Sequence, residues 1–188
     1  MKKLIVASVM LLGAFTTKAQ SIQIIPKAGI NIATQSIEGV SNEKMKVGFQ
    51  GGVGVNLQIA RSNFSIQPEI NYVSKGVALK AGGSKNNLNL GYLELPVLAK
   101  YSFGPVYINA GPSIGLLVSK EEKVIKNYGS EFKKIDVGAL LGAGVALPAG
   151  PGKVIIDARY QLGLNNISEA GDVKNRGIMA SVGYAISL

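Results

Sequence analysis

Eight stretches of this chain alternate apolar and polar residues, and each is at least a dozen residues long. A period of two is the period of a β-strand, because successive side chains point to opposite faces. Strands in globular proteins are usually about 5 or 6 residues long, whereas a strand that crosses a membrane at a tilt needs about 9 to 11. The length therefore favours strands that span a membrane. The eight predicted strands cover residues 22–33, 47–59, 64–75, 88–103, 105–118, 135–147, 153–164 and 177–188.

The stretch Lys153–Leu164 shows how differently the two faces of such a strand are composed. One face carries only apolar side chains, including Ile156 and Tyr160, while the other has Asp157 and Arg159 at its centre. In a soluble sandwich the polar face meets water, and in a membrane barrel it faces the lumen. A Lys or Arg that faces lipid at the membrane centre costs about 2 to 4 kcal/mol, so in a barrel these charges are expected inside.

The polar faces of the eight strands together carry cations and carboxylates in equal number. An eight-stranded barrel has an interior just wide enough for side chains to fill it. We therefore predict a plugged lumen in which these charged groups pair. The predicted lumen charge network consists of Lys27, Glu69, Lys75, Glu94, Lys100, Asp136, Asp157 and Arg159.

The connections between the strands alternate between short and long. The predicted turns are 60–63, 103–105 and 148–152, and the longer, lysine-rich loops are 34–46, 76–87, 119–134 and 165–176. Short periplasmic turns and long external loops are typical of outer-membrane barrels. The pattern predicts an all-β fold, an eight-stranded antiparallel up-and-down transmembrane β-barrel in the cell outer membrane.

The N-terminus has the features of a cleaved signal peptide. Two lysines at positions 2 and 3 precede the apolar segment 4–15, and Thr17-Lys18-Ala19 has the small-x-small form of a cleavage site. We expect a signal peptide over 1–19 and a barrel domain over 20–188; the alternative is a buried N-terminal strand or helix. Loss of the three lysines lowers the formal net charge from +9 to 9 − 3 = +6, which does not indicate nucleic-acid binding.

The composition argues against an enzyme. The chain has no cysteine and no histidine, so it offers no disulfide, thiolate nucleophile, Cys/His zinc site or histidine base. Glu69 and Glu94 resemble the carboxylate pair of a glycosidase, but both also belong to the predicted lumen network. As a nucleotide-binding loop, Gly142-Ala-Gly144 lacks the third glycine and the following helix, and the glycines from Gly138 to Gly144 are better explained as relief of crowding in a bent strand. We expect neither a catalytic site nor a cofactor or metal.

Two further features point to partners. The C-terminus is similar to the polar-x-Gly-x-x-aromatic-x-hydrophobic signal that the barrel-assembly machinery recognises, with Ser181, Gly183 and Leu188 in place and Ile186 where an aromatic residue is usual. The loop 119–134 mixes both charge signs. It is expected to be a solvated hairpin extension, with lipopolysaccharide contact as the alternative, through lysines 120, 123, 126, 133 and 134.

Two strands carry a family resemblance. Gly91-Tyr-Leu-Glu-Leu-Pro-Val-Leu-Ala-Lys-Tyr101 resembles a marker strand of the PorT-like outer-membrane β-barrel family, and Asp157-Ala-Arg-Tyr160, followed by Gly163-Leu-Asn165, is similar to its penultimate strand. The resemblance implies an eight-stranded barrel without an assigned reaction. Some members of that family take part in protein secretion across the outer membrane.

The sequence thus favours a small, non-enzymatic outer-membrane barrel with a structural or surface-interaction role. The alternatives are an accessory component of protein secretion, a narrow diffusion pore, and a soluble lipocalin-like carrier, although a carrier would need an apolar interior. The expected partners are outer-membrane lipid, lipopolysaccharide and the barrel-assembly machinery. We expect a monomer that does not bind nucleic acid.

Overall fold

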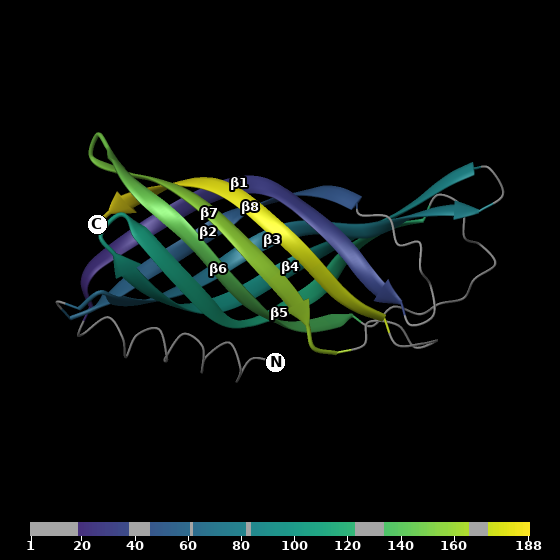
Figure 1. Ribbon diagram of the computed structural model, residues 1–188, viewed down its shortest axis with the longest axis horizontal. Coiled ribbons are helices and arrows are strands. Elements are labelled where there is room, and N and C mark those ends of the chain that lie inside the picture. Colours follow the sequence, from purple (N-terminus) through teal and green to yellow (C-terminus); the bar gives the residue numbers. More distant parts are fainter. Residues whose placement is uncertain (1–18, 38–45, 61, 82–83, 123–133, 166–172) are drawn as a thin grey trace.

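Eight antiparallel strands close into one barrel (Figure 1). The computed structural model describes residues 19–37, 46–60, 62–81, 84–122, 134–165 and 173–188. The predicted signal peptide therefore lies outside the described residues, except for Ala19. The strands are β1 Ala19–Ile37, β2 Lys46–Ile59, β3 Phe64–Ala81, β4 Ser84–Phe103, β5 Val106–Glu122, β6 Ile135–Ala149, β7 Gly152–Gly163 and β8 Val173–Ser187.

The topology is up-and-down, as predicted. Each strand pairs with its neighbours in the chain, and β1 pairs with β8 to close the barrel. This seam runs from Gln23 opposite Ser187 to Ile37 opposite Val173. All described ladders are therefore antiparallel and none requires a crossover. In the described part of the chain there is no helix with the length and apolarity needed to cross a membrane.

The three predicted tight turns are confirmed, and all lie at one end of the barrel. Gly104 and Gly150 have φ angles of 67° and 61°, the left-handed region in which glycine carries no steric penalty. Ala60 has a φ of 49°, and its turn is held by the Ser62 side chain, whose Oγ donates to the Ile59 carbonyl at 2.5 Å. We call this end, at which β2–β3, β4–β5 and β6–β7 are connected, the turn end.

At the opposite end the strands continue further than predicted. The segment 76–87 is expected to be a loop, but β3 reaches Ala81 and β4 begins at Ser84, with Ala81 paired to Ser84. This hairpin projects well beyond the body of the barrel (Figure 1). The expectation of a loop is wrong because alternation is required only where one strand face meets lipid. Beyond the membrane the backbone ladder continues through residues 76–81 without that pattern. Of the other predicted loops, residues 38–45, 123–133 and 166–172 lie outside the described residues.

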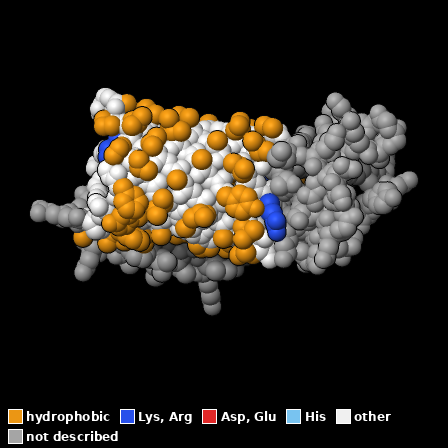
Figure 2. Space-filling view, viewed as in Figure 1, with side chains coloured by type: hydrophobic (Ala, Val, Ile, Leu, Met, Phe, Trp, Pro, Cys, Tyr) orange, Lys and Arg blue, Asp and Glu red, His pale blue; other side chains and the backbone are white. Residues whose placement is uncertain are grey.

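The two faces of the strands are arranged as expected for a membrane barrel. In β7 the side chains of Ile156 and Tyr160 are 47% and 44% exposed, whereas Asp157 and Arg159 are 3% and 6% exposed. Figure 2 shows hydrophobic side chains spread over the described outer surface, with Lys and Arg side chains only towards its margins. The aromatic rings of Phe64, Tyr101 and Phe103 contact one another near the turn end, where aromatic girdles meet the membrane interface.

Candidate functional site

The most densely bonded group in the lumen is the carboxylate of Glu69, on β3. Arg159 of β7 binds it with two parallel hydrogen bonds, Nη1 to Oε2 at 2.8 Å and Nη2 to Oε1 at 3.0 Å. Lys27 of β1 donates to Oε2 at 2.5 Å, and the amides of Gln67 and Asn71 donate at 2.6 and 2.9 Å. Fork-shaped pairing of this kind is the strongest geometry for an arginine and a carboxylate. Three strands are thereby joined through one side chain.

Arg159 also connects Glu69 to a second carboxylate, that of Asp157. The Arg159 Nε lies against Asp157 Oδ1 as an ion pair, although the N–H does not point along a hydrogen bond. Asp157 Oδ2 accepts from Tyr107 Oη at 2.7 Å and from Asn109 Nδ2 at 3.0 Å. We call Lys27, Glu69, Asp157 and Arg159 the Glu69 cluster.

A second cluster lies towards the opposite end, around Lys75 of β3. Its ammonium pairs with Glu94, and with Asp136 Oδ2 at 3.0 Å. Gln161 donates to Glu94 Oε1 at 2.7 Å, and Asn175 donates to Asp136 Oδ2 at 2.9 Å. We call Lys75, Glu94 and Asp136 the Lys75 cluster. Because all three charged side chains are at most 3% exposed, their pairing is what makes their burial tolerable.

An apolar layer separates the two clusters. Val73, Leu98, Leu140 and Met179 pack together and are at most 4% exposed. In the chain, Val73 lies between Glu69 and Lys75, so these four residues lie between the two clusters. They do not fill the cross-section alone, because Gln50 is the ladder partner of Val73, and Asn31 and Arg159 are the ladder partners of Met179.

Glycines on the lumen face of β6 make room for the Glu69 cluster. A Cβ at Gly142 would lie 2.6 Å from both Ala158 O and Arg159 Cγ. A Cβ at Gly144 would overlap the hydroxyl of Tyr107, which is the group that donates to Asp157. The glycine run therefore has a packing role in a closely filled interior.

The structure places all eight predicted network residues on the lumen side of their strands, and seven of them divide between the two clusters. Lys100 differs. Its Nζ lies 3.8 Å from the centroid of the Tyr107 ring, and among the described residues no carboxylate lies within ion-pair distance of it. Glu69 and Glu94, considered above as a catalytic pair, belong to different clusters and are each held by a cation.

Sequence reasoning missed the uncharged members of the network. They are Gln67, Asn71, Tyr107, Asn109, Gln161 and Asn175. Five of the six stand on the polar faces of predicted strands, which would have identified them as lumen residues. Asn175 lies in the predicted loop 165–176, because β8 begins earlier than expected. The alternation does not define the strand register, and the register decides which carboxylate each of these side chains contacts. Among the described residues no group of Asp and Glu side chains is arranged to hold a metal ion.

The four residues of the predicted assembly signal lie on both faces of β8. Ser181 is buried in the lumen at 7% exposure, and Gly183 is paired with Lys27 and Ile155 in the flanking strands. Ile186 and Leu188 are on the outside, at 46% and 79% exposure. Of the four residues of the predicted signal, only Ile186 and Leu188 have side chains that a partner could contact from outside the folded barrel.

The chain is similar to known outer-membrane barrels. Neisserial surface protein A shares its fold with a TM-score of 0.53 at 15% identity, over 85% of this chain and 95% of that one. Ail, the attachment invasion locus protein of Yersinia pestis, does so with a TM-score of 0.51 at 15% identity, over 88% of this chain and 99% of that one. At this identity the two structures show the fold alone. A search of curated proteins finds no match.

The family evidence comes from the sequence. The family described as an outer membrane protein beta-barrel domain matches residues 18–169. Together with eight strands of membrane-spanning length and an apolar exterior, this match puts the protein in the outer membrane of a Gram-negative cell. The chain belongs to the outer membrane protein beta-barrel domain family.

Proposed function

We propose that the protein is a non-enzymatic barrel that serves as a rigid support for its external end, with a structural or surface-interaction role. The observation that carries this proposal is the filled lumen. Two ion-pair clusters and the apolar layer Val73, Leu98, Leu140 and Met179 occupy the space that a pore would need. The side of the molecule that remains available to partners is the end opposite the turns, where the β3–β4 hairpin extends (Figure 1).

The first experiment asks whether the lumen conducts. Purified protein is inserted into planar bilayers, and current is recorded over a range of voltages. We expect no discrete conductance steps, because ion-pair clusters and closely packed side chains fill the lumen of an eight-stranded barrel. Stable, reproducible steps would favour the alternative of a narrow diffusion pore and would contradict a purely supporting role.

The second experiment asks what the external end binds. Ail was crystallised with the heparin analogue sucrose octasulfate, a dense polyanion, which supports testing an anionic surface ligand here. We propose lipopolysaccharide, bound through lysines 120, 123, 126, 133 and 134. Replacing all five with alanine should weaken binding of lipopolysaccharide to protein in nanodiscs, whereas Lys153→Ala at the turn end should not. Equal binding by both variants would contradict the proposal.

A second candidate function is an accessory role in protein secretion. It is supported by the resemblance of Gly91–Tyr101, in β4, to the marker strand of the PorT-like family. Deleting the protein from its native cell and measuring secreted proteins in the medium would test it. A secretion defect that is restored by the wild-type chain would support this role, and unchanged secretion would count against it.

A further inference from the structure

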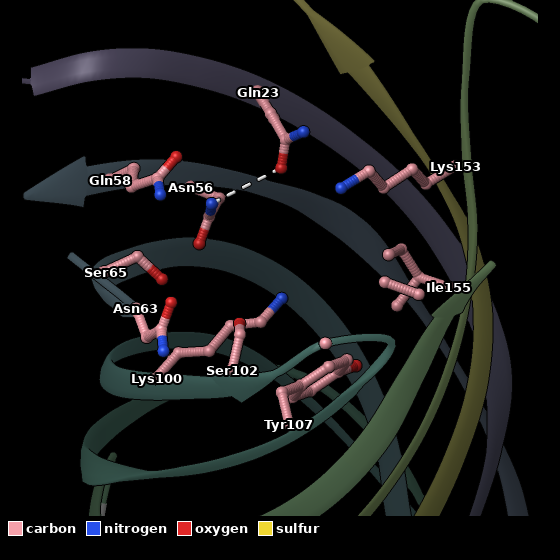
Figure 3. Close-up of a pocket in the computed structure, with 12 residues that line it drawn as sticks. Gln23, Asn56, Gln58, Asn63, Ser65, Lys100, Ser102, Tyr107, Lys153 and Ile155 are labelled. Atoms are coloured by element: carbon pink, nitrogen blue, oxygen red, sulfur yellow. Dashed lines mark hydrogen bonds between the residues drawn. The ribbon is translucent and has the colours of Figure 1, made fainter. Parts of the chain in front are cut away.

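A polar cavity of about 140 Å³ lies inside the turn end of the barrel, apart from the external end (Figure 3). This volume is well above the roughly 10 to 15 Å³ that one water molecule needs. Lys100 and Lys153 both line it, and Figure 3 shows their ammonium groups directed into the same space as the amides of Gln23, Asn56 and Gln58.

The described part of the lining is cationic and has no carboxylate. Among the described residues that line the cavity, the only charged side chains are those of Lys100 and Lys153, and the remainder are amides, hydroxyls and a few apolar groups. Lys100 is 6% exposed, yet its ammonium rests on the face of Tyr107 and has no carboxylate partner among the described residues. A buried ammonium without a paired anion is a costly arrangement.

The carboxylates near the cavity are already bound. Glu69 is held by Lys27 and Arg159, and Asp157 by Arg159, Tyr107 and Asn109. With Lys100 and Lys153 included, the turn half of the lumen holds four cations and two carboxylates, so its net charge is 4 − 2 = +2. The two lysines of the cavity are thus the unbalanced charges.

The neutral groups of the cavity add hydrogen-bonding capacity. Asn56 Nδ2 donates to Gln23 Oε1 at 3.4 Å, while the buried Asn56 Oδ1 has no partner within the described structure. A protonated ligand oxygen would satisfy that acceptor, and the Ser65 hydroxyl is a donor in the lining. The Gln58 amide already donates to Ser62 O at 2.9 Å and has one further N–H.

We propose that this cavity binds a small oxyanion of the phosphate class, which enters from the periplasmic side. Lys100 and Lys153 supply the opposite charge, and Asn56 Oδ1 accepts from a protonated oxygen, which hydrogen phosphate has and sulfate lacks. The phosphate group is that of a free solute or of a phosphomonoester lipid headgroup, since both have the protonated oxygen from which Asn56 Oδ1 would accept. This site is on the opposite side of the membrane from the surface role proposed above and does not depend on it.

The test measures inorganic phosphate binding to the full barrel in phosphatidylcholine nanodiscs by titration calorimetry. We expect saturable binding that is weakened about tenfold or more by Lys100→Met or Lys153→Met, because each removes a charge-assisted contact. Arg176→Met, which removes the same charge from an exposed position outside the cavity, should leave binding unchanged. Sulfate should bind more weakly than phosphate.

Folding of each variant is checked by its heat-modifiable gel mobility. If Lys100→Met fails to fold, Lys153→Met still decides the outcome, because Lys153 is exposed at the start of β7 and is not part of the packed interior. Repeating the titration in nanodiscs that contain phosphatidic acid, a phosphomonoester, separates the sources, with phosphatidylglycerol nanodiscs as the control for surface charge. Weaker binding of free phosphate with phosphatidic acid than with phosphatidylglycerol would identify a competing lipid headgroup in the same site. Absence of saturable phosphate binding, or equal binding by Lys100→Met, Lys153→Met and Arg176→Met, would overturn the proposal.

Discussion

At the scale of single residues, Arg159 is the side chain on which the interior most depends. It makes two hydrogen bonds to Glu69 and pairs with Asp157, so it balances two carboxylates at once. Lys27 contacts Glu69 alone. Loss of Arg159 would leave Asp157 without a cation, whereas loss of Lys27 would leave Glu69 with its arginine.

We therefore expect Arg159→Met to be far more destabilising than Lys27→Met. Removing one partner of a buried ion pair typically costs about 3 to 5 kcal/mol. The free energy of unfolding is measured by urea titration of the barrel in phospholipid vesicles. Arg176→Met, at an exposed position on β8, is the control and should stay within about 0.5 kcal/mol of the wild type. Similar losses for Arg159→Met and Lys27→Met would contradict the central role of the arginine.

A second residue-scale prediction concerns the glycines of β6. Gly142→Ala places a methyl group 2.6 Å from Ala158 O and from Arg159 Cγ, and overpacking of this kind costs about 1 to 3 kcal/mol. At Gly51 an added Cβ meets only Lys27 O, at 3.7 Å. Gly51→Ala should therefore be close to neutral in the same urea titration. A neutral Gly142→Ala would show that the interior is less closely packed than described here.

At the scale of strands, the faces and the ends at the tight turns could be predicted from the sequence, and the ends at the opposite side could not. The alternation in Lys153–Leu164 identified Asp157 and Arg159 as lumen residues because a charge facing lipid is prohibitively costly. That argument stops at the membrane boundary. In the β3–β4 hairpin, strand pairing continues through both apolar and polar residues to Ala81 and Ser84, where no lipid imposes a pattern.

The orientation of β7 can be tested with single cysteines, since the chain contains none of its own. A lipid-soluble thiol probe should label Ile156→Cys, whose wild-type side chain is 47% exposed, and leave Asp157→Cys unlabelled. Gln161→Cys, at a second buried position of the same strand, repeats the lumen measurement without removing a charge. Labelling at 157 and 161 but not at 156 would reverse the assignment of the faces.

The C-terminal strand allows a test of the assembly signal. The predicted signal has Ile186 where an aromatic residue is usual, and this side chain faces outwards. Ile186→Phe should increase the rate of assembly by purified barrel-assembly machinery in proteoliposomes, followed as the heat-modifiable fraction. Ile178→Phe makes the same change on the same face of β8, outside the signal. Equal assembly rates for the two variants would mean that the barrel-assembly machinery does not recognise an aromatic residue at position 186.

At the scale of the whole molecule, the number of strands and their connectivity could be predicted because three independent constraints agree. Strand length, alternation and the contrast between turns and loops all require a barrel that crosses the membrane eight times. The network could be predicted only in part. Sequence alone identified the eight charged residues, but the separation into two clusters depends on the register that puts Val73, Leu98, Leu140 and Met179 in one layer.

A barrel of this construction should be recovered only with detergent and should migrate differently on gels before and after heating. The sheet is closed, so it has no edge strand with unpaired backbone groups, and buried ion pairs hold its interior. Unheated protein should therefore remain compact in mild detergent. Cell fractionation followed by gel electrophoresis with and without boiling measures both properties. Recovery in the soluble periplasmic fraction would instead support the lipocalin-like alternative.

The seam between β1 and β8 has a consequence for how the chain could be rearranged. Leu188 N donates to Ile22 O at 2.9 Å, so the first and last strands begin and end at the same rim, the one that carries the three tight turns. Every other ladder forms between consecutive strands. A short linker from β8 to β1 at this rim would therefore be a fourth tight connection, equivalent to the turns β2–β3, β4–β5 and β6–β7. In a circularly permuted protein, a linker at this rim would join the end of β8 to the start of β1, and the new chain ends would lie at the Gly150 turn. Such a chain would form the same eight ladders, with its strands in a different sequence order.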